Sequence, residues 1–268
     1  MNKKLFFKKP FFPAHQDNLM GHEGDVSTAR QSFLDSRFTN LDFLLSSRYS
    51  WMNDYLSDQQ KIVEIGAGAG FSSLYLKSKV TLTDAADNPW IDEYIDALEI
   101  NYPDNSIDVI IASHTIHHFS NPAKFFFECQ RVLKKDGLIL ISEINTSFLM
   151  RGLLRVLHHE GYSYDVDLFN TESVVNDPSD LWSANCAVPE MLFSQPKVFS
   201  NYFKHLKIDR NELCECSIFP LSGGVISKTK VPRLPIALLR VMSFIDRLLI
   251  KLAPSVFALG RRVVLQKI

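Results

Sequence analysis

The 268-residue sequence predicts an α/β fold built on a doubly wound, mostly parallel sheet. First, short apolar runs alternate with helical stretches between residues 61 and 145. Second, the segment KIVEIGAGAGFS at 61–72 takes a strand-like run directly into three glycines. Third, the composition of 46% hydrophobic and 22% charged residues is that of an ordinary globular protein with one core.

The alternation predicts each element in turn. An amphipathic pattern at 31–57 predicts one or two helices before the sheet. The expected strands are 61–65, 79–84, 95–100, 106–115 and 138–145. The expected helices between them are 70–78, 88–95 and 121–137. Two later segments, 205–219 and 261–268, could complete the sheet as an antiparallel edge pair.

The helix at 121–137 has the clearest end signals. Asn121 is a good N-cap, and Pro122 suits the first turn because its missing N–H would be unpaired there anyway. Gly137 is the expected C-terminal stop.

Charge and cysteine content exclude several classes of partner. The formal net charge is -1 and no basic stripe is interleaved with aromatic residues, so no nucleic-acid partner is expected. The four cysteines lack zinc-ligand spacing and are expected to be reduced thiols. No apolar run is long enough for a membrane span, and the basic start MNKKLFFKKPFFP is a poor signal peptide. A cytoplasmic protein, soluble or peripherally bound to a membrane, is expected.

The three glycines after the first strand are expected to form the floor of a cofactor site. Ligands of doubly wound sheets lie at the carboxyl ends of the strands, where glycine lets the backbone approach closely. A plain tight turn is the alternative. A dinucleotide fingerprint would need glycine at position 71, which is Phe, and no P-loop is present. Glu64, two residues before Gly66, favours a cofactor with positive charge, such as an amine and a sulfonium.

The stretch from 58 to about 145 resembles the class I S-adenosylmethionine-dependent methyltransferases (type 11-like), with E-x-G-x-G-x-G at Glu64–Gly70 as motif I. The segments PDNSIDVIIASHTIHHF and RVLKKDGLILISE are similar to the family's fourth-strand and fifth-strand regions. The resemblance implies a Rossmann-like sheet of seven strands whose last pair is antiparallel. It also implies S-adenosyl-L-methionine as cofactor and S-adenosyl-L-homocysteine as product.

The same resemblance assigns the cofactor-binding residues. Asp84 matches the acid that binds the ribose hydroxyls, and Asp96 matches the acid that meets the adenine amino group. On residue type alone, each could instead cap a helix or turn. The implied set is Glu64, Gly66, Ala67, Gly68, Gly70, Asp84, Asp96, Ala97 and Ser113.

Three regions of one structural domain follow from this reading. Residues 1–57 are expected to form an N-terminal helical extension or lid, and residues 58–145 the cofactor-binding core. Residues 146–268 are expected to hold a helical substrate-side insertion, the closing strands and a basic amphipathic helix.

Histidines after the fourth strand are the candidate catalytic groups, because histidine has a pKa suited to accepting a hydroxyl proton. His118 is the first choice and His114 the second; the alternative is that they shape the pocket wall. His117, His158, His159, Trp182 and Asn185 are the candidate acceptor-binding residues. Adjacent side chains on a helix diverge by about 100°, so His158, His159 and Glu160 are not expected to bind a metal.

The C-terminal half resembles bacterial methyltransferases associated with polysaccharide and surface-glycan assembly, in the stretches LLRVLHHEGY, PSDLWSANCAVPEMLF and PLSGG. That resemblance implies O-methylation of a sugar hydroxyl in a glycan or its lipid-linked precursor. No [DNS]PP[YFW] motif follows the fourth strand, which disfavours methylation of amides or base amines. The alternatives are a methyltransferase of small molecules, quinones or lipids, and an inactive cofactor-binding scaffold.

The tail is basic. Residues 228–268 hold nine Lys or Arg and a single acid, Asp246. A helix is expected from Pro235 to about Ala253, with Arg240, Arg247 and Lys251 on one face. Such a helix could lie in an anionic membrane interface, or pack on the sheet or a partner chain.

Overall fold

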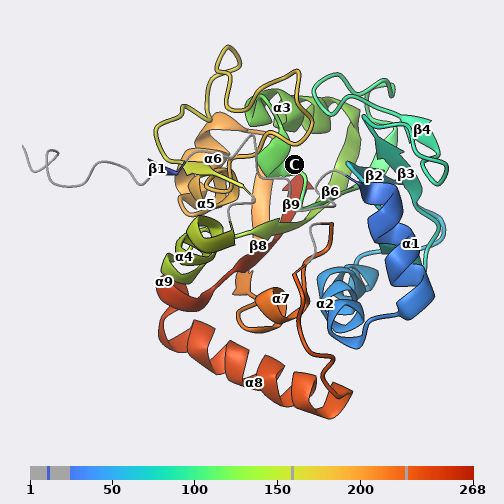
Figure 1. The fold of residues 1–268 in the computed structure, drawn as a ribbon. Coiled ribbons are helices and arrows are strands. Elements are labelled where there is room, and N and C mark those ends of the chain that lie inside the picture. Colours follow the sequence, from blue (N-terminus) through green and yellow to red (C-terminus); the bar gives the residue numbers. More distant parts are fainter. Residues whose placement is uncertain (1–10, 13–24, 158–159, 227–228) are drawn as a thin grey trace, which may run out of the picture.

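The protein has one mixed sheet with helices on both faces (Figure 1). The structure, a computed structural model, describes residues 11–12, 25–157, 160–226 and 229–268. Seven of the described strands form the sheet in the order β4-β3-β2-β5-β6-β9-β8. They are β2 (Ile62–Ile65), β3 (Thr81–Asp84), β4 (Glu93–Tyr94), β5 (Ile107–Ser113), β6 (Leu133–Ile144), β8 (Leu206–Cys214) and β9 (Gly260–Lys267).

The strand directions confirm the predicted topology. The five strands from β4 to β6 run parallel, and β9 runs antiparallel to both β6 and β8. Two short strands, β1 (Phe11–Phe12) and β7 (Tyr162–Ser163), pair apart from this sheet. The carboxyl ends of β2, β3 and β5 therefore meet at one edge, where ligands of such sheets bind.

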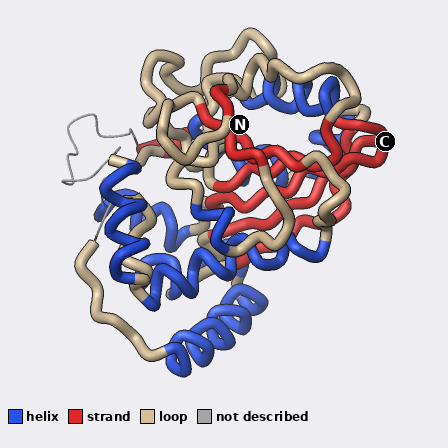
Figure 2. Tube along the Cα trace, turned by 90° about the vertical axis from the view of Figure 1, so that its right-hand side faces the viewer, coloured by secondary structure: helices blue, strands red, loops and turns tan. Residues whose placement is uncertain are grey.

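Helices cover both faces of the sheet (Figure 2). The described α-helices are α1 (Val26–Ser36), α2 (Thr39–Tyr49), α3 (Pro122–Val132), α4 (Phe148–Leu157), α5 (Val188–Phe193), α6 (Pro196–Tyr202), α7 (Ile218–Leu221), α8 (Ile236–Leu252) and α9 (Pro254–Phe257). Short 3-10 helices are η2 (Ser50–Asp54), η3 (Phe71–Leu74) and η4 (Ile116–His118).

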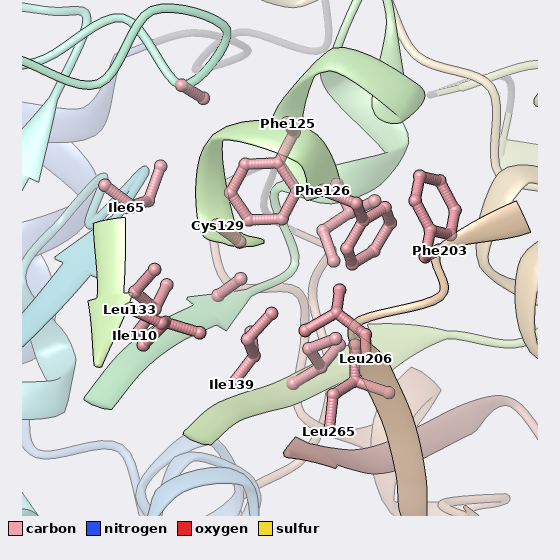
Figure 3. Close-up of a cluster of buried hydrophobic side chains, with 14 of the residues drawn as sticks. Ile65, Ile110, Phe125, Phe126, Cys129, Leu133, Ile139, Phe203, Leu206 and Leu265 are labelled. Carbon is pink, nitrogen blue, oxygen red and sulfur yellow. The ribbon is translucent and has the colours of Figure 1, made fainter. Parts of the chain in front are cut away.

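Two apolar layers hold the helices to the sheet. On one face, Ile110 and Ile139 pack with Phe125 and Phe126 of α3 and with Phe203 (Figure 3). On the other face, residues of α1, α2 and η2 pack on the alternate side chains of the same strands. The central strand β5 is buried on both sides, which is why its sequence reads as a continuous apolar run.

Helix α3 begins as predicted and ends earlier than predicted. The Asn121 side-chain oxygen accepts from the Lys124 N–H at 2.9 Å, and Pro122 occupies the first turn. The helix stops at Val132 because Leu133 already begins β6. Gly137 is therefore a strand residue: a Cβ there would lie 3.0 Å from the Asp108 carbonyl oxygen of the neighbouring strand β5.

Two further predicted helices are wrong. The 70–78 helix is reduced to η3, because Asn53 accepts from the Lys77 N–H at 2.8 Å and donates to the Tyr75 carbonyl at 3.0 Å. The 88–95 segment is tied to β3 instead: the Asp92 N–H and carboxylate both bond Leu82, at 2.8 Å each.

The third strand is consequently displaced. It is β4 (Glu93–Tyr94), and the predicted strand at 95–100 is absent from the described sheet. Asp96 lies two residues after the end of β4 and pairs with Glu99 in an isolated bridge outside the named strands. The pairing of Asp84 with Tyr94 still brings this segment next to the end of β3.

Helix α8 confirms the predicted tail helix and stands apart from the sheet at the bottom of Figure 1. Its inner side holds Leu239, Asp246 and Ile250, all buried. The Asp246 carboxylate accepts from the Ser217 hydroxyl at 2.7 Å and the Ile218 N–H at 3.2 Å. Among the described residues, no helix combines the length and apolar character that crossing a membrane requires.

Candidate active site

The glycine loop after β2 has all three glycines in the left-handed region, with φ of +69° at Gly66, +52° at Gly68 and +62° at Gly70. A Cβ on Gly66 would lie 2.0 Å from the Thr115 hydroxyl, and one on Gly70 would lie 2.8 Å from the Trp90 ring. A Cβ on Gly68 would meet no described atom within 4 Å. Two glycines thus allow close packing within the protein, whereas Gly68 faces open space.

Asp84 joins the glycine loop to the end of β3. Its Oδ2 accepts from the Gly68 N–H at 2.7 Å and its Oδ1 accepts from the Ala86 N–H at 2.8 Å. A carboxylate offers about four acceptor positions, so each oxygen can accept a second hydrogen bond. The carboxylate is held by the backbone and still able to bind a diol.

Glu64 lies beneath the loop and is buried. The Ser72 hydroxyl donates to its Oε2, while its Oε1 has no hydrogen-bond partner among the described residues. Burial, with the nearby charge of Asp84, raises the pKa of Glu64 to about 8. A cationic group close to this carboxyl would give Oε1 the partner that it lacks. The same positive charge would favour the ionised form of Glu64.

Residues from outside the motif close one side of the loop. The Trp90 indole N–H donates to the Gly68 carbonyl at 2.8 Å. Arg30 of α1 donates to the Ala69 carbonyl, and its guanidinium lies 4.8 Å from the centroid of the Trp90 ring. The N-terminal helix α1 therefore contacts the glycine loop. Its action as a lid stays a prediction.

The remaining cofactor candidates lie on the same edge of the sheet. Ala67 is buried in the loop, and its N–H donates to the Thr83 carbonyl at 2.9 Å. Asp96 is exposed and its Oδ1 accepts from the Leu98 N–H at 2.8 Å, while Ala97 is buried. Ser113 ends β5 and hydrogen-bonds Tyr49 of α2. Roles for these residues stay predictions.

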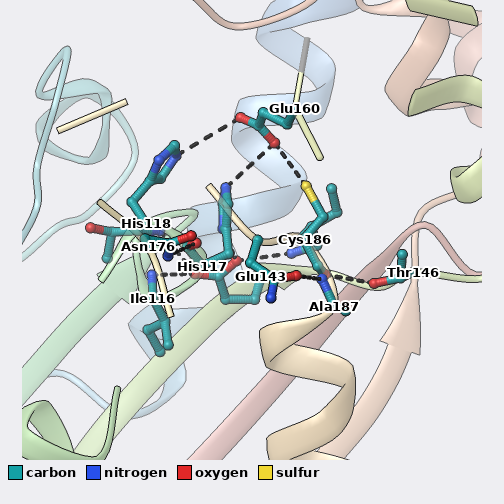
Figure 4. Close-up of polar contacts among 12 residues, drawn as sticks. Ile116, His117, His118, Glu143, Thr146, Glu160, Asn176, Cys186 and Ala187 are labelled. Atoms are coloured by element: carbon teal, nitrogen blue, oxygen red, sulfur yellow. Dashed lines mark hydrogen bonds and ion pairs between the residues drawn. The ribbon is translucent and has the colours of Figure 1, made fainter. Parts of the chain in front are cut away.

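A buried polar cluster follows β5 (Figure 4). The Glu143 carboxylate, at the end of β6, accepts from the N–H groups of Thr115 and Ile116 at 2.9 and 2.6 Å. It also accepts from His117 Nδ1 at 2.7 Å. On the opposite side of the His117 ring, Nε2 faces Glu160 Oε2 at 3.7 Å.

His118 faces the same carboxylate from a neighbouring position. Its Nε2 is 3.9 Å from Glu160 Oε1, and its Nδ1 donates to the Ser183 carbonyl at 3.2 Å. The Trp182 ring stands nearly perpendicular to the His118 ring, with centroids 6.2 Å apart. The fold therefore brings His117, His118, Trp182 and Glu160 together, and their roles stay predictions.

Charges in this cluster shift the pKa values of both histidines. Burial opposes a charge on His117, but Glu143 and Glu160 outweigh it and raise the pKa of His117 to about 10. Burial and the neighbouring His117 lower the pKa of His118 to about 4, so its ring is neutral at pH 7. Burial also opposes the charge of Glu160, but hydrogen bonding and attraction to His117 lower the pKa of Glu160.

Two other candidate site residues, His114 and Asn185, are already buried or hydrogen-bonded within the protein. His114 has φ of +52°, its Nε2 is buried with no hydrogen-bond partner among the described residues, and burial lowers its pKa well below the usual value. Asn185 uses its amide to accept from the Ser163 and Ala187 N–H groups at 2.8 and 3.1 Å and to donate to the Ser163 carbonyl at 2.9 Å. Acceptor binding by Asn185 stays a prediction. His158 and His159 lie outside the described residues.

Sequence reasoning missed Glu143 and Cys186. The Cys186 thiol donates to Glu160 Oε2 at 2.9 Å. Glu143 could have been found, because it ends the strand next to β5 in a parallel sheet and must lie near the residues that follow β5. Cys186 had no such signal, since its position depends on the fold of the 160–187 segment.

Comparison with known proteins identifies the core. Residues 63–141 match the family model of a methyltransferase domain. The chain is 28% identical over 101 residues to the uncharacterized methyltransferase YcgJ of Bacillus subtilis (strain 168), covering 31% of this chain and 40% of that protein. It is 40% identical over 47 residues to a probable S-adenosylmethionine-dependent methyltransferase of Mycobacterium tuberculosis (strain H37Rv), covering 18% of this chain and 17% of that protein. The matches thus span less than half the length of these curated relatives.

The fold comparison agrees. A crystal structure of a SAM-dependent methyltransferase from Thermotoga maritima superposes with a TM-score of 0.51 and 15% identity, covering 92% of this chain and 98% of that one. At this identity the likeness concerns the fold alone. The family match identifies residues 63–141 as a methyltransferase domain, and the sheet that contains them has the expected Rossmann-like order with an antiparallel last pair of strands.

Proposed function

We propose that the whole chain is an S-adenosylmethionine-dependent methyltransferase that methylates a sugar hydroxyl of a surface glycan or of its lipid-linked precursor. The observation that carries the methyltransferase assignment is Gly68. It opens on space that no described atom fills, and its N–H is bound to Asp84, the acid suited to a ribose diol. The unpaired, buried Oε1 of Glu64 suits a cationic cofactor bound at the same loop.

The proposed chemistry is an in-line displacement. The acceptor oxygen attacks the sulfonium methyl carbon, the C–S bond breaks, and its electron pair stays on sulfur to leave a neutral thioether. The hydroxyl proton passes to His118, whose neutral ring can accept it at Nε2, with His114 as the second choice. Most of the rate enhancement would come from positioning the two reactants.

Trp182 supports a sugar acceptor. Its side chain keeps 42% of its surface exposed while its ring stands beside His118. An exposed indole offers an apolar face on which a sugar ring can stack. The carboxylate of Glu160 lies beside His118 and could accept hydrogen bonds from the hydroxyls of that sugar. The combination of one aromatic face with polar groups around a histidine is suited to a polyhydroxylated acceptor.

Transfer of a labelled methyl group tests this proposal. Purified protein would be incubated with S-adenosylmethionine labelled in its methyl group and with separate glycan, lipid-linked glycan and small-molecule fractions. Label in a glycan fraction, absent with Trp182→Ala but kept with the exposed-residue control Val174→Ala, is expected. Label only in simple lipids or small molecules would contradict the glycan acceptor. Cofactor binding without any transfer would indicate a scaffold.

The outer side of α8 supports a membrane-associated acceptor. Its exposed apolar residues follow a spacing of three and four positions: Leu238, Val241, Ile245, Leu248 and Leu252. Arg240, Arg247 and Lys251 are exposed beside them, and the single acid, Asp246, is buried. An apolar stripe flanked by bases is complementary to an anionic lipid surface, where each base contributes about 1 kcal/mol.

Vesicle flotation tests that surface. We expect the full chain to float with vesicles containing anionic lipid and to float less with neutral ones. The double variant Val241→Asp/Leu248→Asp should stay in the soluble fraction, whereas Val174→Asp, at an even more exposed valine, should float like the parent. Equal flotation of both variants would exclude α8 as the contact.

A further inference from the structure

We propose that His117, His118 and Glu160 form a binding site for one divalent transition-metal ion of the Zn²⁺ class. Their ligand atoms, one from each residue, lie within 4.8 Å of one another. The two histidines come from η4 after β5, and Glu160 comes from the segment after α4 (Figure 4). Three separate side chains thus converge on one point although the two histidines are adjacent in sequence.

The distances suit a tetrahedral ion. Zn²⁺ lies about 2.0–2.2 Å from nitrogen and oxygen ligands, so two ligand atoms of one ion are about 3.4 Å apart. The two His Nε2–Glu160 distances are 3.7 and 3.9 Å. These two distances would shorten by a few tenths of an ångström around an ion, and the widest pair among the three ligand atoms, within 4.8 Å, would close by up to about 1.4 Å.

The surrounding hydrogen bonds orient both rings for metal binding. His117 Nδ1 bonds the buried Glu143 carboxylate at 2.7 Å, and His118 Nδ1 bonds the Ser183 carbonyl at 3.2 Å. Both partners accept, so each Nδ1 carries a hydrogen. Once the ion displaces the Nε2 proton of His117 into solvent, both rings would present an Nε2 lone pair to the ion. Histidine ligands of metals are usually held in this way, by a carboxylate or a carbonyl on the second ring nitrogen.

Charge and access are also favourable. The carboxylates of Glu143 and Glu160 together carry the two negative charges that balance a dication, and the Cys186 thiol donates to Glu160 and holds it in place. The side chains of Glu160 and His118 keep 29% and 18% of their surface exposed. An ion held by three protein ligands would keep a position open to solvent on this side.

The consequence for the reaction rests on the proposed function. The open position would take the acceptor hydroxyl beside Trp182, and the ion would replace His118 as the group that promotes loss of the hydroxyl proton, which would pass to solvent water. Metal-loaded protein and chelator-treated protein would therefore differ in turnover and keep the same affinity for S-adenosylmethionine.

Direct metal binding tests the site without any acceptor. The full chain, freed of metal with a chelator, would be titrated with Zn²⁺ by calorimetry and with Co²⁺ by visible absorption. We expect one tight equivalent, a tetrahedral Co²⁺ spectrum, and no comparable binding of Mg²⁺, which prefers oxygen ligands. Glu160→Gln and His118→Ala should each weaken Zn²⁺ binding at least about 100-fold.

Two matched control variants test whether any loss of Zn²⁺ binding is specific to the proposed ligands. Glu172→Gln and His205→Ala change an exposed glutamate and an exposed histidine elsewhere and should bind Zn²⁺ like the parent. Thermal melts would confirm that Glu160→Gln is folded. The proposal is overturned if folded parent protein binds no stoichiometric Zn²⁺, or if Glu160→Gln and His118→Ala bind it unchanged. Neither result bears on cofactor binding, so failure here is separable from failure of the methyltransferase proposal.

Discussion

The three glycines of the loop differ in what a side chain at each position would disturb. Gly66 and Gly70 are needed because Thr115 and Trp90 pack against them, so substitution there would damage the fold itself. Gly68 is different, because only its backbone conformation, with φ of +52°, and the adjoining open space constrain it. It is therefore the position at which cofactor binding can be separated from folding.

Gly68→Val should abolish binding of S-adenosylhomocysteine, with an affinity loss of at least about 100-fold, or roughly 2.7 kcal/mol. The left-handed backbone should cost about 1–2 kcal/mol of folding stability, which leaves the protein folded. Calorimetry and a thermal melt measure the two effects. Gly152→Val, in α4 with no described atom within 4 Å of its Cβ, is the control and should bind normally. Retained binding by Gly68→Val would refute the loop as the cofactor floor.

Glu64 should make stability depend on pH. Its pKa is raised from the usual 4.5 to about 8 in the folded protein, so the folded state holds a proton that the unfolded state releases. The associated stability is full below about pH 4.5 and is lost as the pH rises through about 8.

Glu64→Gln removes this titration. Between pH 5 and pH 9 the variant should gain at least about 1 kcal/mol of unfolding free energy relative to the parent, since each pKa unit corresponds to about 1.4 kcal/mol. Urea unfolding at several pH values measures the difference. The exposed Glu99→Gln is the control. A pH-independent difference between variant and parent would show that Glu64 ionises normally in the folded state.

At the scale of elements, Asn121 connects α3 to the segment 170–173. Its oxygen caps the helix at Lys124, and its amide donates to the carbonyls of Asn170 and Ser173 at 3.2 and 2.7 Å. The same side chain therefore sets where α3 begins and where the segment leading to Trp182 lies.

Two substitutions separate these roles. Asn121→Ala should cost about 1–2 kcal/mol through loss of the cap and speed hydrogen exchange in 170–185. Asn121→Asp keeps the cap acceptor and loses the amide donors, so it should retain most of the helix stability while exchange in 170–185 still rises. Exchange mass spectrometry reads out both. Unchanged exchange in Asn121→Asp would mean that the segment is held by other contacts.

At the scale of the whole molecule, a buried ion pair ties the N-terminal helices to the far edge of the sheet. Arg48 of α2 binds Glu215, just after β8, through two hydrogen bonds of 2.9 and 2.7 Å. Both side chains are about 5% exposed or less. The helices that carry Arg30 to the glycine loop are thereby attached to the C-terminal half of the chain.

Arg48→Met should cost about 3–5 kcal/mol of unfolding free energy, because it leaves the Glu215 carboxylate buried without its partner. Adding Glu215→Gln should recover part of that loss. The surface pair Arg37–Asp42, 3.5 Å apart and about half exposed, is the comparison, and Arg37→Met should cost under about 1 kcal/mol. Equal costs at the two sites, measured by urea unfolding, would show that the buried pair is not structural.

Much of the fold could be predicted from the sequence, because its signals are local. Apolar runs located β2, β3, β5, β6, β8 and β9, and Pro235 and Ala253 bounded α8 correctly. The helices predicted at 70–78 and 88–95 were wrong because partners outside each segment, the Asn53 side chain and the Leu82 backbone, take the hydrogen bonds that a helix would need. Periodicity carries no information about such competition.

The sequence by itself determined the sheet except for β4, the glycine loop and the acid that closes β3, since apolar periodicity and the left-handed backbone of glycine are properties of adjacent residues. Only the tertiary structure decided that His117 lies between Glu143 and Glu160, and that His118 shares the second of these carboxylates. These residues meet because β5, which precedes the two histidines, pairs in parallel with β6, which carries Glu143. The chain after α4 then brings Glu160 back to the same place. A contact between side chains so far apart depends on strand pairing and packing, which no local pattern encodes.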